Sequence, residues 1–219
     1  MRKALTGCDT VVHLAALHPL IAPPDADDAT YHQANVVPLA ALLAVSSEVA
    51  VRRVVFASST SVWTDSPPGT PARFLDESVP ADAEDPYARS KRTGEDLLSR
   101  SRFAWVVLRL ARFASSGSAE DQVRKLYRAI HPDDAAMAVA LATKLAPARS
   151  LYAVSAPTPF TYEDAALLAK DPRAAIRLRT GHEPAWVPDR IGSVVVPTRL
   201  MRELGWRPAH PSALMADSR

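Results

Sequence analysis

The sequence predicts an α/β fold built around a parallel sheet. Three short apolar runs carry this prediction, and each contains two adjacent valines and has the length of a buried strand. They span residues 11–16, 53–59 and 105–110. Segments with helical spacing separate them, at residues 29–48 and 87–100. Strand, helix and strand in alternation are typical of βαβ units, in which consecutive strands run parallel.

The two intervening helices have apolar faces and recognisable breaks. In the first, the apolar residues near one face are Val36, Leu39, Ala40, Leu43 and Val45. Pro38 lies inside that pattern and predicts a kink or a late helix start, because proline lacks an N–H donor. The second helix follows Pro86, a favourable residue for the first helical position, and turns Leu97 and Leu98 inward.

The remaining elements are shorter. Helices are predicted over residues 133–145, 161–170 and 198–204, and a strand over 151–154. Thr161 with Asp164 three residues later resembles a capping box, and Gly205 ends the last helix. Two segments lack periodicity, residues 18–28 and the proline-rich residues 64–86, and both are predicted loops.

Composition excludes several functional classes. The 219 residues are 47% hydrophobic and carry a net charge of +2. The basic residues are scattered, which argues against nucleic-acid binding. Cys8 is the only cysteine, so the chain cannot form an internal disulfide or a CxxC metal site. No apolar run is long enough to span a bilayer, and no signal peptide is visible. A soluble cytoplasmic protein is therefore expected.

A candidate catalytic set stands at the end of the second strand and the start of the helix after it. Tyr87 and Lys91 are four residues apart and lie on one helix face. A nearby ammonium favours the phenolate, so Lys91 is expected to bring the pKa of Tyr87 towards neutrality. Tyr87 is then a general acid/base. Ser59 would hold the substrate oxygen at the carboxyl edge of the sheet, where ligands bind in such folds.

The same residues have simpler interpretations. A Tyr–Lys pair on a helix is often only a solvated face, but here it follows a strand that ends in Ser58-Ser59. No GxSxG motif supports a hydrolase. No metal site is expected, because His13, His18 and His32 have irregular spacing, and a helix start explains the acids after His131. The seven glycines form no GxxGxxG loop.

Several segments together resemble the extended short-chain dehydrogenase/reductase family, the NAD-dependent epimerases and dehydratases. Residues 7–16 resemble that family's GxDxVxHxAA strand, and residues 54–63 its VVFxSSxxVY segment. Tyr87 and Lys91 match YxxxK. Residues 130–136 and 204–208 resemble the weaker hxHVxD and LGWxP segments. The match covers most of the chain.

The resemblance implies a fold, a cofactor and a site. The fold would be a partial doubly wound, Rossmann-type parallel sheet lacking the family's first three strands, with a small C-terminal substrate lobe. Residues 1–115 would form the partial dinucleotide-binding domain and 116–219 the substrate region, intertwined with the first. The cofactor would be NAD or NADP, the substrate a small molecule, and the assembly a homodimer. The catalytic residues would be Ser59, Tyr87 and Lys91, and the cofactor contacts Leu14, Ala15, Ala16, Asn35, Ser58, Tyr87 and Lys91.

Departures from the family pattern lead to further expectations. Arg112 stands where the family often has an asparagine, and residues 117–131 are short for a sugar-nucleotide lobe, which argues against the usual nucleotide-sugar substrate. Without the glycine loop, this chain should bind dinucleotide weakly or not at all. Without its usual partner strand, the strand at residues 11–14 would have an apolar open edge that promotes self-association or poor solubility. A non-catalytic regulatory or binding protein, or a mis-started or decayed gene product, are the alternatives to an impaired epimerase/dehydratase-type oxidoreductase.

Overall fold

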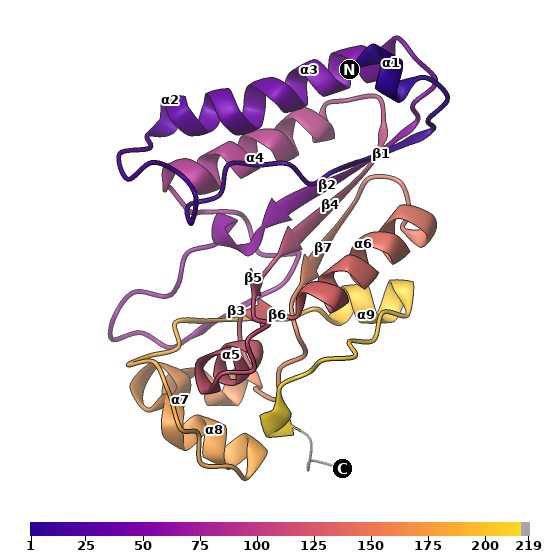
Figure 1. Ribbon diagram of the computed structural model, residues 1–219. Helices are drawn as coiled ribbons and strands as arrows, with labels where there is room; N and C mark the ends of the chain where they lie inside the picture. The colour runs from indigo at the N-terminus through magenta and orange to yellow at the C-terminus, as the bar shows by residue number, and fades with distance from the viewer. Residues whose placement is uncertain (216–219) are drawn as a thin grey trace. The chain divides into compact units, whose positions relative to one another are not determined.

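A computed structural model describes residues 1–215 and confirms the parallel α/β fold. Four strands form the main sheet in the order β1-β2-β4-β7. They are β1 (Thr10–His13), β2 (Arg53–Ser59), β4 (Ala104–Leu110) and β7 (Ser150–Val154). Strands β1 and β2 run parallel with Val11 beside Val54, and the arrows of β2, β4 and β7 point the same way in Figure 1. β1 is at one end of the sheet among the described residues, in agreement with the predicted open edge.

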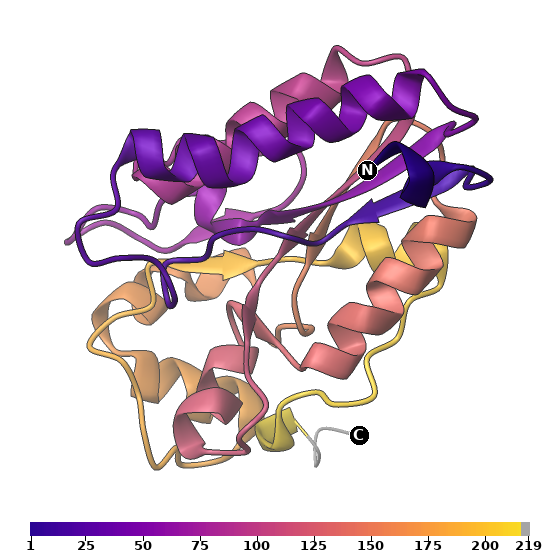
Figure 2. The same cartoon turned by 45° about the horizontal axis from the view of Figure 1, so that its top comes forward.

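Two helical segments form one layer over one face of this sheet. The first consists of α2 (Asp28–Tyr31), a π-helical segment (His32–Val36) and α3 (Val37–Ser47), and the second is α4 (Pro86–Ser99). Figures 1 and 2 show α3 and α4 side by side over the strands. The π-segment ends just before Pro38, where the proline ring would clash with a carbonyl of the preceding turn and leave it unbonded. A wider turn relieves both problems. The kink or late helix start predicted from Pro38 takes the form of this π-helical segment, after which α3 begins at Val37 with Pro38 in its first turn.

The core between these helices and the sheet holds α4 close to β2. Leu39, Phe56, Leu98 and Val107 are buried together. Gly94 faces them from α4, and a Cβ atom there would lie 2.7 Å from Cζ of Phe56. Only glycine permits this approach. It brings the N-terminal half of α4, with Tyr87 and Lys91, against the end of β2.

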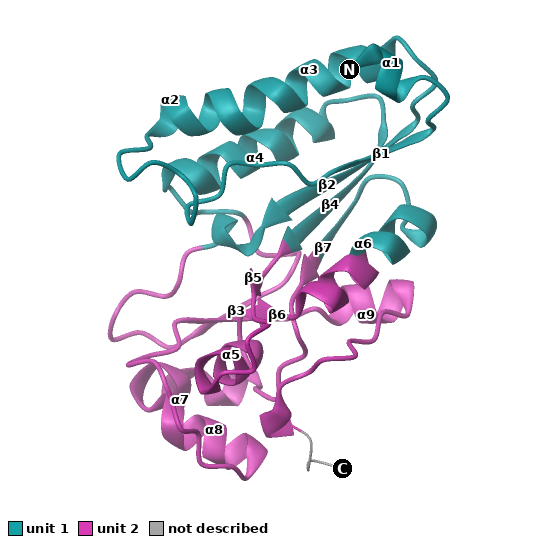
Figure 3. Ribbon diagram, viewed as in Figure 1, with its two compact units in different colours: residues 1–63, 81–109, 139–152 teal, residues 64–80, 110–138, 153–219 magenta. Residues whose placement is uncertain are grey.

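The chain divides into two compact units, coloured separately in Figure 3. Unit 1 consists of residues 1–63, 81–109 and 139–152, and unit 2 of residues 64–80, 110–138 and 153–219. The units interleave along the sequence, and the predicted domain ranges 1–115 and 116–219 stay a prediction. None of the helices among residues 1–215 has both the length and the apolar character needed to cross a membrane.

Unit 2 holds two small parallel strand pairs and several short helices. β3 (Arg73–Leu75) pairs with β8 (Ser193–Val195), and β5 (Arg112–Phe113) pairs with β6 (Ala129–Ile130). The remaining elements of the chain are α1 (Arg2–Leu5), α5 (Ala119–Lys125), α6 (Pro132–Leu145), α7 (Ala165–Lys170), α8 (Pro172–Thr180), α9 (Thr198–Leu204) and 3₁₀ turns at Thr60–Val62, Tyr162–Asp164 and Ala213–Met215. Helix α6 and strand β7 each contribute residues to both units.

Unit 2 also corrects two predictions. The predicted loop at residues 64–86 contains β3, which is too short to show a period and pairs with β8 from far along the chain. The predicted helix at 161–170 begins as a 3₁₀ turn, although its capping box between Thr161 and Asp164 is present. A further helix, α8, follows directly because Asp171 caps it and Pro172 occupies its first turn.

Candidate active site

Ser59, Tyr87 and Lys91 come together in unit 1. Ser59 is the last residue of β2, and its hydroxyl caps the 3₁₀ turn Thr60–Val62 by accepting a hydrogen bond of 3.1 Å from the amide of Ser61. Helix α4 begins at Pro86 because the Asp85 carboxylate accepts from the amide of Ala88 at 2.9 Å. The helix start therefore places Tyr87 in the first turn, where its hydroxyl hydrogen-bonds the Ser59 side chain.

Lys91 lies one turn further along α4 and is buried. Its ammonium donates to the carbonyl of Ala57 at 2.8 Å, and it lies 5.1 Å from the ring centroid of Phe56 and 5.8 Å from that of Tyr87. Burial lowers the pKa of Lys91 to about 8, and the negative charge of Glu95 opposes that shift. The side chain therefore still carries a positive charge at neutral pH.

The prediction that Lys91 brings the pKa of Tyr87 down towards neutrality is wrong, because that pKa is raised. Burial raises the pKa of Tyr87 above its usual 10, and the hydrogen bond from Ser59 only opposes this. The rings of His18 and Tyr31 lie edge-on to the phenol ring, with centroids 5.3 and 5.8 Å away, and exclude water from it. Because the Lys91 ammonium points to the Ala57 carbonyl, it does not offset that desolvation. The phenol is thus protonated at neutral pH.

A buried ion pair lies one helical turn beyond Lys91 on α4. Sequence reasoning missed it. Glu95 and Arg109 join through two hydrogen bonds of 3.0 and 2.7 Å, and their side chains are only 12% and 7% exposed. The Arg109 guanidinium also lies 4.6 Å from the ring centroid of Trp63. Glu95 follows Lys91 by four residues on α4, and that spacing was the available signal. The partner Arg109 comes from a different strand.

Ser58 belongs to this ion-pair network. Its hydroxyl donates to the Glu95 carboxylate at 2.5 Å. The two adjacent serines at the end of β2 therefore point in opposite directions, as strand geometry requires. Ser59 faces Tyr87, while Ser58 anchors the strand end to α4, so the predicted cofactor contact of Ser58 stays a prediction.

Asn35 fixes the loop that follows β1. Its side-chain oxygen accepts from the amide of Leu17 at 2.7 Å, and its side-chain nitrogen donates to the Leu17 carbonyl and to Ser90 Oγ at 3.2 and 3.0 Å. Ser90 in turn donates to the carbonyl of Tyr87 at 2.7 Å. This predicted cofactor residue thus connects the loop after β1 to the helix turn that carries Tyr87.

The other predicted cofactor residues, Leu14, Ala15 and Ala16, lie at the start of that loop. Leu14 is 57% exposed, and Ala15 is exposed as well. His13, the last residue of β1, stacks on Phe56 with ring centroids 5.9 Å apart. Burial and, to a smaller extent, the charge of Lys91 lower the pKa of His13. The end of β1 and the start of the loop after it therefore present neutral and largely apolar side chains.

The geometry defines a parallel α/β protein with a Ser–Tyr–Lys set at the carboxyl end of a central strand. The family model for the NAD dependent epimerase/dehydratase family matches residues 1–154. The chain belongs to this enzyme family, and the resemblance found in its motifs is confirmed.

One curated protein is similar in sequence, and solved structures are similar in fold. A ketoreductase of Stigmatella aurantiaca, which acts on 4-hydroxy-2-methyl-3-oxo-4-farnesyl-3,4-dihydroquinoline-1-oxide, is 31% identical over 114 residues; these are 50% of this chain and 32% of that protein. The chain thus spans about a third of its length. An Agrobacterium tumefaciens short-chain dehydrogenase/reductase superfamily protein with bound NAD has a TM-score of 0.68 at 18% identity, covering 99% of this chain and 80% of that one. A UDP-Glc/GlcNAc 4-epimerase from Campylobacter jejuni gives 0.67 at 16%, covering 98% and 77%.

Proposed function

We propose that this chain carries the proton-transfer machinery of an NAD(P)-dependent oxidoreductase of the epimerase/dehydratase type. Its substrate would be the hydroxyl or carbonyl group of a sugar or a related small molecule. The observation that carries the proposal is the hydrogen bond between Tyr87 and Ser59 with the Lys91 ammonium one helical turn away. Family membership supports it.

The roles of the three side chains follow from their surroundings. Tyr87 would transfer a proton to or from the substrate oxygen, and Ser59 would hold that oxygen by a hydrogen bond. Because burial raises the pKa of Tyr87 rather than lowering it, the phenol stays protonated at neutral pH and would donate a proton, which is the direction of carbonyl reduction. The Lys91 charge, fixed by the Ala57 carbonyl, would favour the phenolate that forms after this donation.

The residues fit the nicotinamide end of a dinucleotide better than its pyrophosphate end. Tyr87 and Lys91 lie side by side and could hold a ribose, and the exposed Leu14 and Ala15 could line the adenosine side. When bound, NAD(P) would supply or accept the hydride. The seven glycines give no pyrophosphate loop. This polypeptide is therefore expected to bind NAD and NADP weakly, and a calorimetric titration giving micromolar affinity would contradict that.

Turnover tests the proposed role of Tyr87. The chain is mixed with a large excess of NADH or NADPH and a panel of aldehydes, ketones and nucleotide sugars, and oxidation of the cofactor is followed by absorbance. Tyr87→Phe removes only a hydroxyl and should lower the rate by about 10²–10⁴-fold. Tyr162→Phe is the matched control, because Tyr162 is 72% exposed and lies in unit 2.

The two possible failures of that test have different meanings. Equal rates for Tyr87→Phe and the unmutated chain would remove Tyr87 from catalysis. A folded chain that oxidises neither cofactor with any carbonyl compound would favour the non-catalytic binding or regulatory protein. In that case a cellular phenotype that survives Tyr87→Phe would settle the matter against an enzyme.

A homodimer and a cytoplasmic location complete the proposal. The resemblance suggests an interface on the helices that carry Asn35 and Tyr87, and Arg89 of α4 already pairs with Asp28 of α2 at 2.7 Å on that surface. Sedimentation of the unmutated chain at several concentrations would test the dimer. Cys8 is a free thiol, which suits a reducing compartment.

A further inference from the structure

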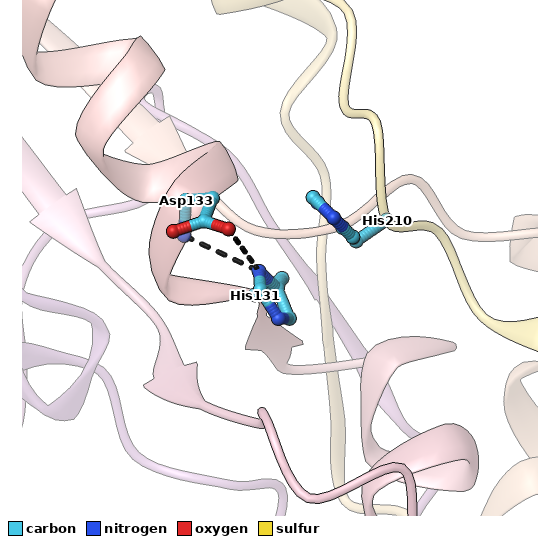
Figure 4. A group of neighbouring side chains, drawn as sticks. All are labelled: His131, Asp133 and His210. Carbon is cyan, nitrogen blue, oxygen red and sulfur yellow. Dashed lines mark hydrogen bonds and ion pairs between the residues drawn. The ribbon is translucent and has the colours of Figure 1, made fainter.

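Three side chains that the catalytic proposal does not use meet at the start of α6. His131 and Asp133 flank Pro132, and His210 comes from the segment after Gly205. One nitrogen or oxygen of each lies within 4.8 Å of the others. Figure 4 shows the Asp133 carboxylate against His131, with the His210 ring beside it. We propose that His131, Asp133 and His210 bind a divalent transition-metal ion of the Zn²⁺ type.

The donor set selects the class of ion. Two imidazole nitrogens and one carboxylate oxygen suit Zn²⁺ and its neighbours, whereas Mg²⁺ and Ca²⁺ prefer oxygen donors alone. Nδ1 of His131 and Oδ2 of Asp133 are 3.7 Å apart. Two ligands each at about 2.0–2.1 Å from a tetrahedral ion are about 3.4 Å apart. Nδ1 of His131 also accepts a hydrogen bond of 3.3 Å from the Asp133 amide, so it must give up that bond as the two atoms contract onto one ion.

A buried carboxylate outside the ligand set orients His210. Asp134 is buried, and it accepts hydrogen bonds from the amides of Ala209 and His210 at 2.7 and 3.0 Å. Its Oδ1 also lies 3.4 Å from Nδ1 of His210. The tautomer of His210 with its proton on Nδ1 would donate to this carboxylate and leave the lone pair of Nε2 for an ion. A carboxylate behind the imidazole is the usual outer support of metal-binding histidines.

The rings must turn before they bind one ion together. His131 and His210 stack with centroids 4.0 Å apart and 22° between their planes. An ion cannot lie in both ring planes at that distance. His210 is 43% exposed on its side chain and Asp133 is 76% exposed, so both have room to rotate. Binding would then link the start of α6 to the segment at residues 206–210, within unit 2.

The experiment uses the full chain without a polyhistidine tag, stripped of metal and titrated with ZnCl₂ in a calorimeter. Co²⁺ absorption in a parallel sample reports nitrogen and oxygen coordination. One ion per chain is expected, with excess Mg²⁺ unable to displace it. His210→Ala and Asp133→Asn should each weaken binding by at least about tenfold. His182→Ala, a histidine of the same unit outside the cluster, should bind as the unmutated chain does.

Two outcomes would overturn the proposal. One is the absence of Zn²⁺ binding by a chain whose circular dichroism shows it folded. The other is an affinity that His210→Ala and Asp133→Asn leave unchanged, which would mean that the ion binds elsewhere. Because both mutated side chains are substantially exposed, thermal melts of the metal-free variants should match that of the unmutated chain.

Discussion

The end of β2 with α4 and the loop after β1 belong to the same compact unit but are built in opposite ways. At the first, charged and polar side chains are buried and paired, with Lys91 on a carbonyl and Glu95 on Arg109. At the second, Leu14, Leu20 and Ile21 are 57%, 77% and 73% exposed. Charge is buried in one region, and apolar surface is exposed in the other.

The difference separates a region whose buried charges all have partners from a region whose apolar side chains are uncovered. Burying an ion costs several kcal/mol unless its partners are in place. The paired charges at the end of β2 therefore have, within this chain, the partners that their burial requires. Exposed apolar side chains on a loop gain stability only when something covers them. The prediction of self-association therefore concerns the loop after β1 and the strand edge before it, and the predictions on catalysis and stability concern the end of β2.

The largest expected effect is at the buried ion pair. Glu95→Ala leaves the Arg109 guanidinium 7% exposed without its carboxylate, and it also removes the acceptor of Ser58. The free energy of unfolding should fall by about 3–5 kcal/mol, as is usual when one member of a buried pair is lost. Urea denaturation followed by circular dichroism measures this change.

An exposed pair provides the matched control. Glu120 and Arg124 form an ion pair at 2.6 Å as well. They are four residues apart on helix α5, and their side chains are 43% and 28% exposed. Glu120→Ala should therefore cost less than about 1 kcal/mol. Equal losses for the two variants would show that burial does not distinguish the two pairs.

Lys91 should make stability depend on pH in the alkaline range. Its pKa is about 8 in the folded chain and 10.5 in the unfolded one, so between these values the unfolded state binds more protons. Stability then increases with pH, by about 2 kcal/mol between pH 7 and pH 9.5. The raised pKa values of Tyr87 and Tyr127 act in the opposite direction only above pH 10. Unfolding in urea across this range gives the slope.

Lys91→Met is the comparison variant for this slope. It fills the same space without an ionisable group, so the increase between pH 8 and pH 9.5 should disappear. The variant should also be at least as stable as the unmutated chain at pH 7, where burial of the ammonium is most costly. A slope that persists in Lys91→Met would assign it to another group.

Local patterns predicted the elements that carry the catalytic set. Adjacent valines marked β1, β2 and β4, and Pro86 marked the start of α4, because these signals come from neighbours in the chain. What the sequence could not show were pairings between distant segments. Arg109 reaches Glu95 from a strand, β3 pairs with β8, and His210 reaches His131 from near the far end of the chain.

The direction of the Tyr87 shift shows a second limit. The spacing of Tyr87 and Lys91 correctly placed them on one helix face, and proximity of a cation favours a phenolate. Desolvation by His18 and Tyr31 outweighs it, and the ammonium is turned to the Ala57 carbonyl. Burial depends on the packing of three segments, which no local pattern in the sequence encodes.

The smallest effect on stability is expected at the loop after β1. Leu20 and Ile21 are the most exposed large apolar residues of that loop. Leu20→Ser with Ile21→Ser should change the free energy of unfolding by less than about 0.5 kcal/mol per site, because little buried area is lost. Self-association should nevertheless decrease, since the substitutions remove exposed apolar surface from the loop after β1.

Sedimentation velocity over a range of concentrations measures this second effect. Leu178→Ser is the matched control, because Leu178 is 67% exposed but lies on α8 of unit 2. It should leave association unchanged if the loop after β1 is the contact. A decrease of similar size in Leu178→Ser would mean that exposed leucines associate in general. A fully monomeric unmutated chain would instead show that the open edge is protected, and the contrast between the two regions would then concern stability alone.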